Sequence, residues 1–242
     1  MARVDQAPTF ASPAPPWIER DERAGDSPLV ERVTHARFVG QGGEVTTPDG
    51  CWDLVVLRVG GATQVLQTGI ITRPVRLDFG PGDEYLCISF KPGVFMPQMP
   101  GDQMVDRGLP RPLVSRRAFW LDGDTLEIPT FENAEGLVTR LARQGTLTKD
   151  EIVARSVGGD PWAISERSLE RHFRRALGVT PKSLQQILRA RQAVRLLGQG
   201  RPAVAVATEL GYADQPHLVR SLKKLMGQTP RAFAPPRSTE PR

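Results

Sequence analysis

The 242-residue sequence contains few of the residues that disulfide frameworks and metal centres need. It has two cysteines, Cys51 and Cys87, and three histidines. Two cysteines cannot build a disulfide framework. His35 is the single histidine in residues 1–162, so any histidine-dependent catalysis or metal binding there would rest on it alone. We therefore expect no metal and no cofactor.

Long apolar runs and catalytic motifs are also missing. No stretch of about 18 apolar residues occurs, and the first residues lack a basic segment followed by an apolar one. The sequence contains no G-x-S-x-G, P-loop, H-E-x-x-H or C-x-x-C motif. Asp49 and Asp53 lie four residues apart, but such a pair alone is a weak indication of catalysis. We expect a cytoplasmic protein that neither enters a membrane nor acts as an enzyme.

Charge is distributed unevenly along the chain. The net charge of +5 averages two very different parts. Residues 1–162 carry 17 Lys/Arg against 22 Asp/Glu, whereas residues 163–242 carry 15 against 5, a net charge of +10. An acidic part joined to a strongly basic last third indicates that one end of the protein meets a polyanion.

The N-terminal part shows a β pattern between about residues 33 and 93. Strands are expected over 51–59, 62–68, 75–79 and 86–90, where apolar residues cluster or alternate between Gly and Pro breaks. The proline-rich residues 1–28 and the residues 235–242 are expected to be disordered tails. A helix is expected from Thr130 as N-cap to a stop at Gly145, and a shorter one over 150–157. The first domain boundary is therefore placed near residue 145.

The last third of the chain contains an internal repeat. Residues 165–181 and 214–230 align without gaps at an offset of 49 residues. Each copy has an N-cap residue type, an apolar stripe at helical spacing, a basic opposite face and a glycine C′ candidate before Thr-Pro. A duplication of this density predicts two copies of one supersecondary unit, with helices at about 165–177 and 214–226.

The segments around the two repeated helices complete the pattern. A longer helix is expected over 181–197, and an Ala/Val-rich helix precedes Gly211. A helix, a glycine-containing turn and a basic helix make a helix-turn-helix. Two such motifs could place their second helices in successive major-groove segments, about 34 Å apart.

The last third resembles the DNA-binding domain of AraC/XylS-type bacterial transcription regulators. The similarity covers roughly residues 148–233 and rests on S-x-x-S-L-E-R-H-F-R-R-x-L-G-V-T-P, on R-x-x-x-A-V-R-L-L and on E-L-G-Y-A-D-Q-P-H-L-V-R-S-L-K-K-x-x-G-Q-T-P-R-A-F. One departure is the sequence Gly158-Gly-Asp-Pro-Trp162, which interrupts the place of a regular helix before the first recognition helix. More faintly, Pro48-Asp-Gly-Cys-Trp-Asp-Leu54 and Ile88-Ser-Phe-Lys-Pro-Gly93 resemble the β-rich sensor domains of such regulators.

The resemblance implies a set of DNA contacts. The implied base-contacting residues are Arg167, Glu170, Arg171, Gln215, His217 and Arg220. The implied backbone contacts are Arg174, Arg175, Lys223 and Lys224. Arginine can read guanine and glutamine can read adenine in the major groove. For Glu170, acceptance from cytosine and an ion pair with Arg167 or Arg171 are both open; for His172, phosphate contact and packing are both open.

Two further features of the N-terminal part carry alternatives. Trp52, Phe90, Phe95 and Trp120, near Met96, Met99 and Met104, are candidates for an apolar effector pocket, and ordinary core packing is the alternative. Cys51 and Cys87 are candidate redox or electrophile sensors, although thiols in apolar strands are usually inert. They also lack the clustered ligand spacing expected of a metal-bound DNA-repair domain.

Together these patterns predict an α+β protein with two domains. A β-rich sensor or dimerisation domain, expected to be a small barrel or cupin-like fold, spans residues 29–145. An all-α domain with two helix-turn-helix motifs spans residues 146–234. The predicted function is sequence-specific transcription regulation. The expected partners are double-stranded DNA, RNA polymerase, a small-molecule effector and a second copy of the chain; the last three are implied by the resemblance. The alternative is a non-enzymatic helical adaptor or RNA-binding module that uses the same basic faces.

Overall fold

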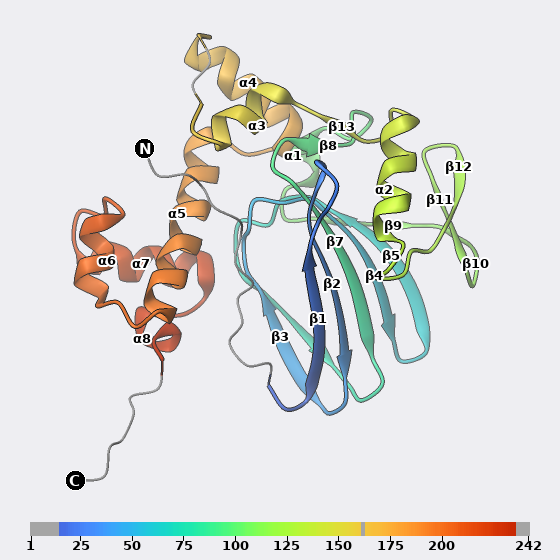
Figure 1. Cartoon of the computed structure of the whole chain (residues 1–242), viewed down its shortest axis with the longest axis horizontal. Coiled ribbons are helices and arrows are strands. Elements are labelled where there is room, and N and C mark those ends of the chain that lie inside the picture. The colour runs from blue at the N-terminus through green and yellow to red at the C-terminus, as the bar shows by residue number, and fades with distance from the viewer. Residues whose placement is uncertain (1–14, 161–162, 236–242) are drawn as a thin grey trace.

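The computed structural model describes residues 15–160 and 163–235. A β-rich part is followed by a helical part that lies alongside it (Figure 1). The predicted α+β organisation, β-rich first and helical last, is confirmed. Within the described residues, no helix combines the length and the apolar character needed to cross a membrane.

The largest sheet has six antiparallel strands in the order β1-β2-β7-β4-β5-β9. Its strands are β1 (Ile18–Ala24), β2 (Val30–Phe38), β4 (Asp53–Val59), β5 (Ala62–Thr68), β7 (Glu84–Phe90) and β9 (Gly108–Arg111). The predicted strands at 62–68 and 75–79 have the expected bounds, and those at 51–59 and 86–90 each begin two residues away from the predicted start. Because the pairing among the described residues ends at β1 and β9, a closed barrel stays a prediction.

Three smaller sheets complete the β-rich part. They pair β3 (Gly42–Thr46) with β6 (Val75–Phe79), β8 (Val94–Phe95) with β13 (Thr148–Lys149), and β10 (Leu113–Ser115) with β11 (Ala118–Leu121) and β12 (Asp124–Glu127). The aromatic ring of Phe79 on β6 stacks on Phe38 of β2 at 4.1 Å between ring centroids. This contact holds the β3–β6 pair against the end of the main sheet. Because β13 follows the predicted boundary at 145, the chain returns to the β-rich part before the helices begin.

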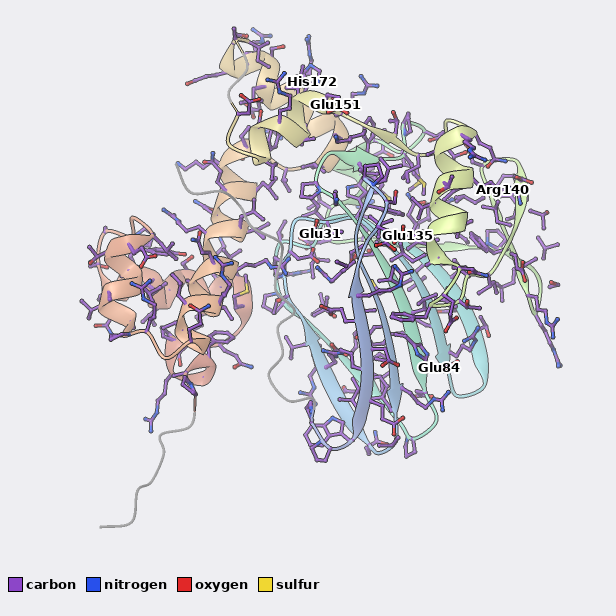
Figure 2. All side chains as sticks on the ribbon, in the orientation of Figure 1. Glu31, Glu84, Glu135, Arg140, Glu151 and His172 are labelled. Atoms are coloured by element: carbon purple, nitrogen blue, oxygen red, sulfur yellow. The ribbon has the colours of Figure 1, made fainter. Side chains whose placement is uncertain are left out.

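The expectation that residues 1–28 form a disordered tail is wrong for the described residues 15–28. β1 pairs with β2 along its whole length, from Ile18 opposite Phe38 to Ala24 opposite Arg32. The carboxylate of Glu135, which points toward the β1–β2 turn (Figure 2), accepts hydrogen bonds from Arg23 and from the backbone N–H groups of Asp26 and Ser27, each at 2.8 Å. Backbone pairing and this anchor order a strand that has few apolar residues. The tail expected over 235–242 lies outside the described residues except for Pro235.

The helix expected from Thr130 begins later than predicted. α2 spans Ala134–Arg143 with Asn133 as N-cap. Thr130 and Asn133 instead close a turn, since the Thr130 N–H donates to Asn133 Oδ1 at 2.8 Å. Gly145 follows the helix with a φ of 76°, which supports the predicted stop. The segment that contains Met96, Met99 and Met104 holds the short helix α1 (Gly101–Met104).

The helical part contains six helices among the described residues. They are α3 (Glu151–Val157), α4 (Glu166–Leu177), α5 (Pro181–Gly198), α6 (Ala203–Glu209), α7 (Gln215–Met226) and α8 (Pro230–Phe233). Figure 1 shows α3 and α4 at one end of the long helix α5. The helices α6, α7 and α8 lie toward the other end of α5. One hydrophobic core runs through both parts of the protein, and it includes Leu54 of β4 and Leu184 of α5.

Candidate nucleic-acid interface

The sequence repeat folds into two matching helices. α4 and α7 each have 12 residues. Ser165 Oγ accepts the Ser168 N–H at 3.2 Å, and Asp214 Oδ1 accepts the His217 N–H at 2.6 Å, so both N-caps form as predicted. Gly178 and Gly227 end the helices with φ values of 75° and 74°. The two predicted helices are confirmed at both ends.

Each repeated helix is the second helix of a helix-turn-helix. α6 and α7 are joined by a turn that contains Gly211, with a φ of 69°, and the buried Tyr212. α3 precedes α4, but the connection over 158–165 is longer, as the Gly158-to-Trp162 interruption suggested; Pro161 and Trp162 lie outside the described residues. On α4, Phe173 and Leu177 are buried and Leu169 is half-buried; the corresponding residues of α7, Leu222, Met226 and Leu218, are all buried.

The exposed face of α4 is basic and concave. Arg167, Arg171, Arg174 and Arg175 are exposed there. Together with Ser165, Ser168, Glu170 and Asp102 of α1, they line a hollow of about 730 Å³. Glu170 accepts two hydrogen bonds from Arg174, at 2.9 and 2.7 Å, rather than pairing with Arg167 or Arg171 as one sequence alternative held. The structure thus brings the predicted contacts of the first helix together on one surface.

The exposed face of α7 carries the second predicted set. Gln215, Arg220, Lys223 and Lys224 are exposed. His217 is half-buried, and its ring meets the Tyr212 ring edge-on at 5.3 Å between centroids while its Nδ1 accepts the Ala213 N–H at 3.3 Å. In the free protein this imidazole therefore braces the turn before α7.

His172 has a packing role in this structure. Its side chain lies toward the start of α3 (Figure 2), where Nδ1 is 2.7 Å from Asp150 Oδ2. Asp150 is also the N-cap of α3, because its other oxygen accepts the Ile152 and Val153 N–H groups at 3.1 and 3.2 Å. His172 therefore links the two helices of the first motif.

Contacts between the two parts of the protein were not foreseen from the sequence. Gly101 of α1 packs closely on Gly178, the residue that ends α4. A Cβ on Gly178 would lie 2.2 Å from the carbonyl oxygen of Gly101. The guanidinium of Arg175 lies 5.6 Å from the centre of the Phe95 ring. Arg191 of α5 donates to the backbone carbonyl of Asp49 at 3.3 Å. The β-rich part therefore contacts both a predicted recognition helix and the helix that follows it.

Three of the four aromatic candidates for an effector pocket are buried in the core, and the fourth is exposed. Trp52, Phe90 and Phe95 are core residues that are at most 3% exposed, whereas Trp120 is 44% exposed. Of the three methionines, Met96 and Met104 are buried in the core, and Met104 also lines a smaller pocket together with Met99. Burial raises the pKa of the Cys51 and Cys87 thiols well above the ordinary value, which disfavours the reactive thiolate that a sensor needs.

Comparisons with known proteins agree with this geometry. The family described as helix-turn-helix domain matches residues 162–235. The Regulatory protein ada of Salmonella typhimurium is 31% identical over 94 residues, which are 39% of this chain. The chain spans a quarter of that relative's length, 25%. No solved structure matches the chain significantly. Residues 162–235 of this chain therefore form a helix-turn-helix domain of the AraC type.

Proposed function

We propose that this protein is a sequence-specific transcription regulator that inserts α4 and α7 into neighbouring major-groove segments. The observation that carries this proposal is the pair of equally long, equally capped helices with exposed basic faces, joined through α5. The 18 residues of α5 make a helix about 27 Å long. That length is of the same order as one turn of DNA, about 34 Å, so both helices can meet one face of the duplex.

The proposed roles follow the repeat. Arg171 and Arg220 occupy equivalent, exposed positions near the middle of their helices and would read base edges. Lys223 and Lys224 lie in the last turn of α7 and would contact phosphates, as would Arg174 once it leaves Glu170. Phosphate neutralisation supplies much of the affinity and makes it depend on salt.

Two substitutions on α7 separate base reading from phosphate binding. Arg220→Ala is expected to remove about 1–3 kcal/mol of discrimination between the cognate site and random DNA, because a bidentate base contact is lost. Lys223→Ala is expected to weaken binding to both DNAs about equally and to lower the salt slope by about one. The cognate site comes from randomised-site selection on the full chain, and affinities come from fluorescence anisotropy at several salt concentrations.

The same measurements judge the competing function. A helical adaptor or RNA-binding module would use the basic faces without preferring any duplex sequence. If selection enriches no site, or if Arg220→Ala lowers affinity for cognate and random DNA equally, base reading by α7 is rejected. Tighter binding to RNA than to any duplex would favour the alternative.

The remaining functional proposals concern the β-rich part. We place effector sensing and self-association there, and we place the protein in the cytoplasm, where it would contact RNA polymerase. Support comes from the contacts of this part with α4 and α5, since a change in it can alter how the recognition helices are held. In this proposal the protein performs no catalysis.

A further inference from the structure

A surface pocket lies at the β9 edge of the main sheet, lined by other residues than the hollow on α4. Its volume is about 270 Å³. Residues from two segments line it: Gln98, Met99, Pro100, Gln103 and Met104 in and before α1, and Arg107, Gly108 and Leu109 at the start of β9. The pocket is slightly smaller than the usual range for drug-sized ligands, so it suits a small molecule.

Two buried hydrogen-bond donors behind the wall of this pocket, on residues that do not themselves line it, have no acceptor within the described part of the chain. They are Nε2 of Gln67 and Nε of Arg111. Gln67 on β5 lies directly opposite Leu109 on β9, and Val65 lies opposite Arg111, so Gln67, Leu109 and Arg111 share one face of the sheet. Arg111 Nη2 donates to Gln67 Oε1 and to Met99 Sδ, which ties the two polar side chains to the pocket wall. Leaving buried donors unpaired is costly, so this pair calls for an acceptor.

The electrostatics of the pair favour an acceptor that is negatively charged. Burial lowers the pKa of Arg111, because nearby negative charge offsets only part of the cost of burying the positive charge of the guanidinium. Asp122 is the carboxylate that acts on it, but an oxygen of Asp122 already accepts from Gln98 and from Thr146. Arg107 supplies a positive charge in the pocket wall itself. Met99, Met104 and Leu109 supply apolar surface next to these donors.

We propose that this pocket binds a small carboxylate with a short apolar chain. The apolar chain would lie against Met104 and Leu109, and the Met99 side chain would move aside so that the carboxylate oxygens accept from Arg111 and Gln67 behind it. Hydrogen bonds to a charged partner are stronger than neutral ones, and a planar guanidinium suits a carboxylate. The ligand class rests on this geometry, whereas its role as an effector rests on the proposed function.

Binding is tested on the full chain without DNA, so the result is independent of whether the protein regulates transcription. Hexanoate is the probe, and hexan-1-ol and hexylamine match its chain with a neutral and a cationic head. Isothermal titration calorimetry is expected to show hexanoate binding at least about tenfold more tightly than either control. Equal affinity for hexanoate and hexan-1-ol, or no hexanoate binding at all, would overturn the proposal.

Two variants locate the bound carboxylate. Arg111→Gln is expected to weaken hexanoate binding by about tenfold to a hundredfold, because a charge-assisted contact is lost. Gln67→Glu places a carboxylate beside Arg111 within the chain and is expected to abolish hexanoate binding. Arg116→Gln, at an exposed arginine in the turn between β10 and β11, is the matched control and should bind as the parent does. Folded Arg111→Gln protein with parental affinity would place hexanoate elsewhere and reject the site; if that variant does not fold, the comparison of the three probes on the parent chain decides.

Discussion

The carboxyl group of Asp53 ionises less readily in the folded protein than in water. Its Oδ1 is buried and makes no hydrogen bond of normal geometry in the described part of the chain, although the Ser89 hydroxyl and the Cys87 thiol lie near the carboxylate, while Oδ2 accepts from Thr68 at 3.3 Å. Arg32, the cation next to it, already pairs with Asp49. Burial, helped by the negative charge of Asp49 and opposed by Arg32, raises the pKa of Asp53 to about 6. The ionised carboxylate is therefore disfavoured in the folded state.

Replacing Asp53 by Asn should make the protein relatively more stable as the pH rises. The unfolded carboxyl ionises near pH 4, whereas the folded one holds its proton until about pH 6. The stabilisation from the proton is present below pH 4 and is lost as the pH rises through 6. Between pH 4 and 7 the parent should lose about 2–3 kcal/mol relative to Asp53→Asn, as measured by urea unfolding of both proteins.

Asp78→Asn provides the control for this pH experiment. Asp78 lies on β6 and its side chain is 66% exposed, so its difference from the parent should vary by less than about 0.5 kcal/mol over the same range. Parallel pH profiles for the parent and Asp53→Asn would show that Asp53 ionises normally in the folded protein.

At the scale of single residues, the sequence predicts which side chains are exposed better than it predicts which side chains they contact. The spacing placed Arg171 and Arg220 on the exposed faces of their helices, since 3.6-residue periodicity decides which side of a helix is buried. It could not identify Arg174 as the partner of Glu170 among several arginines within reach. Nor could it gather the aromatic candidates into a pocket, because a tryptophan such as Trp52 fills a core as readily as it lines a cavity.

At the scale of elements, the two helix C-caps form an internal comparison. Gly178 and Gly227 have nearly the same positive φ, but their surroundings differ. A Cβ on Gly178 would lie 2.2 Å from the backbone oxygen of Gly101, whereas a Cβ on Gly227 would lie 3.2 Å from Pro74 Cγ. The first approach involves two backbones that cannot easily separate. The second leaves room for a small adjustment.

The two alanine substitutions should therefore differ in their effect on stability. Gly227→Ala is expected to lower the free energy of unfolding by about 1–2 kcal/mol, which is the strain of a left-handed alanine. Gly178→Ala should lower it by about 1–3 kcal/mol more, because the added methyl group also forces α1 from α4. Urea unfolding measures both. Gly136→Ala within α2, where a Cβ meets no atom within 4 Å, is the control and should be neutral or stabilising. Equal losses at the two caps would mean that the α1–α4 contact does not form in solution.

Strand β1 shows which elements the sequence could not predict. The strands at 62–68 and 75–79 have regular alternation or tight Gly and Pro boundaries, and they were predicted with their observed bounds. In β1, Ile18 is the one buried residue, because the strand lies at the edge of the sheet. Its stability comes from the ladder with β2 and from Glu135, more than a hundred residues away in sequence. The pattern of apolar residues in the sequence predicts neither the pairing with β2 nor the hydrogen bonds to Glu135.

On the scale of the whole molecule, the helical part contacts the β-rich part at several places, of which three lie on α4, α5 and α7. Gly101 meets the end of α4, Asp49 meets Arg191 on α5, and Pro74 approaches the end of α7 at Gly227. The Gly101 and Pro74 contacts lie at the C-terminal ends of the two proposed recognition helices, whereas Arg171 and Arg220 lie nearer the middles of these helices. The acidic and basic parts of the chain are therefore in contact, while the residues proposed to read bases stay exposed.

This arrangement predicts how a fragment comprising residues 148–235 should behave. It keeps both repeated helices, their caps and α5, so it is expected to prefer the same DNA site as the full chain, with a ratio of specific to random affinity within about tenfold of the full chain's. Leu184, against which Gly50 packs in the full chain, becomes exposed in the fragment. The unfolding midpoint of the fragment should therefore be lower than that of the full chain. Fluorescence anisotropy measures the preference, and circular dichroism confirms that the fragment is folded under the same conditions. A folded fragment that binds every duplex equally would show that contacts from the β-rich part are required to set the recognition helices for base reading.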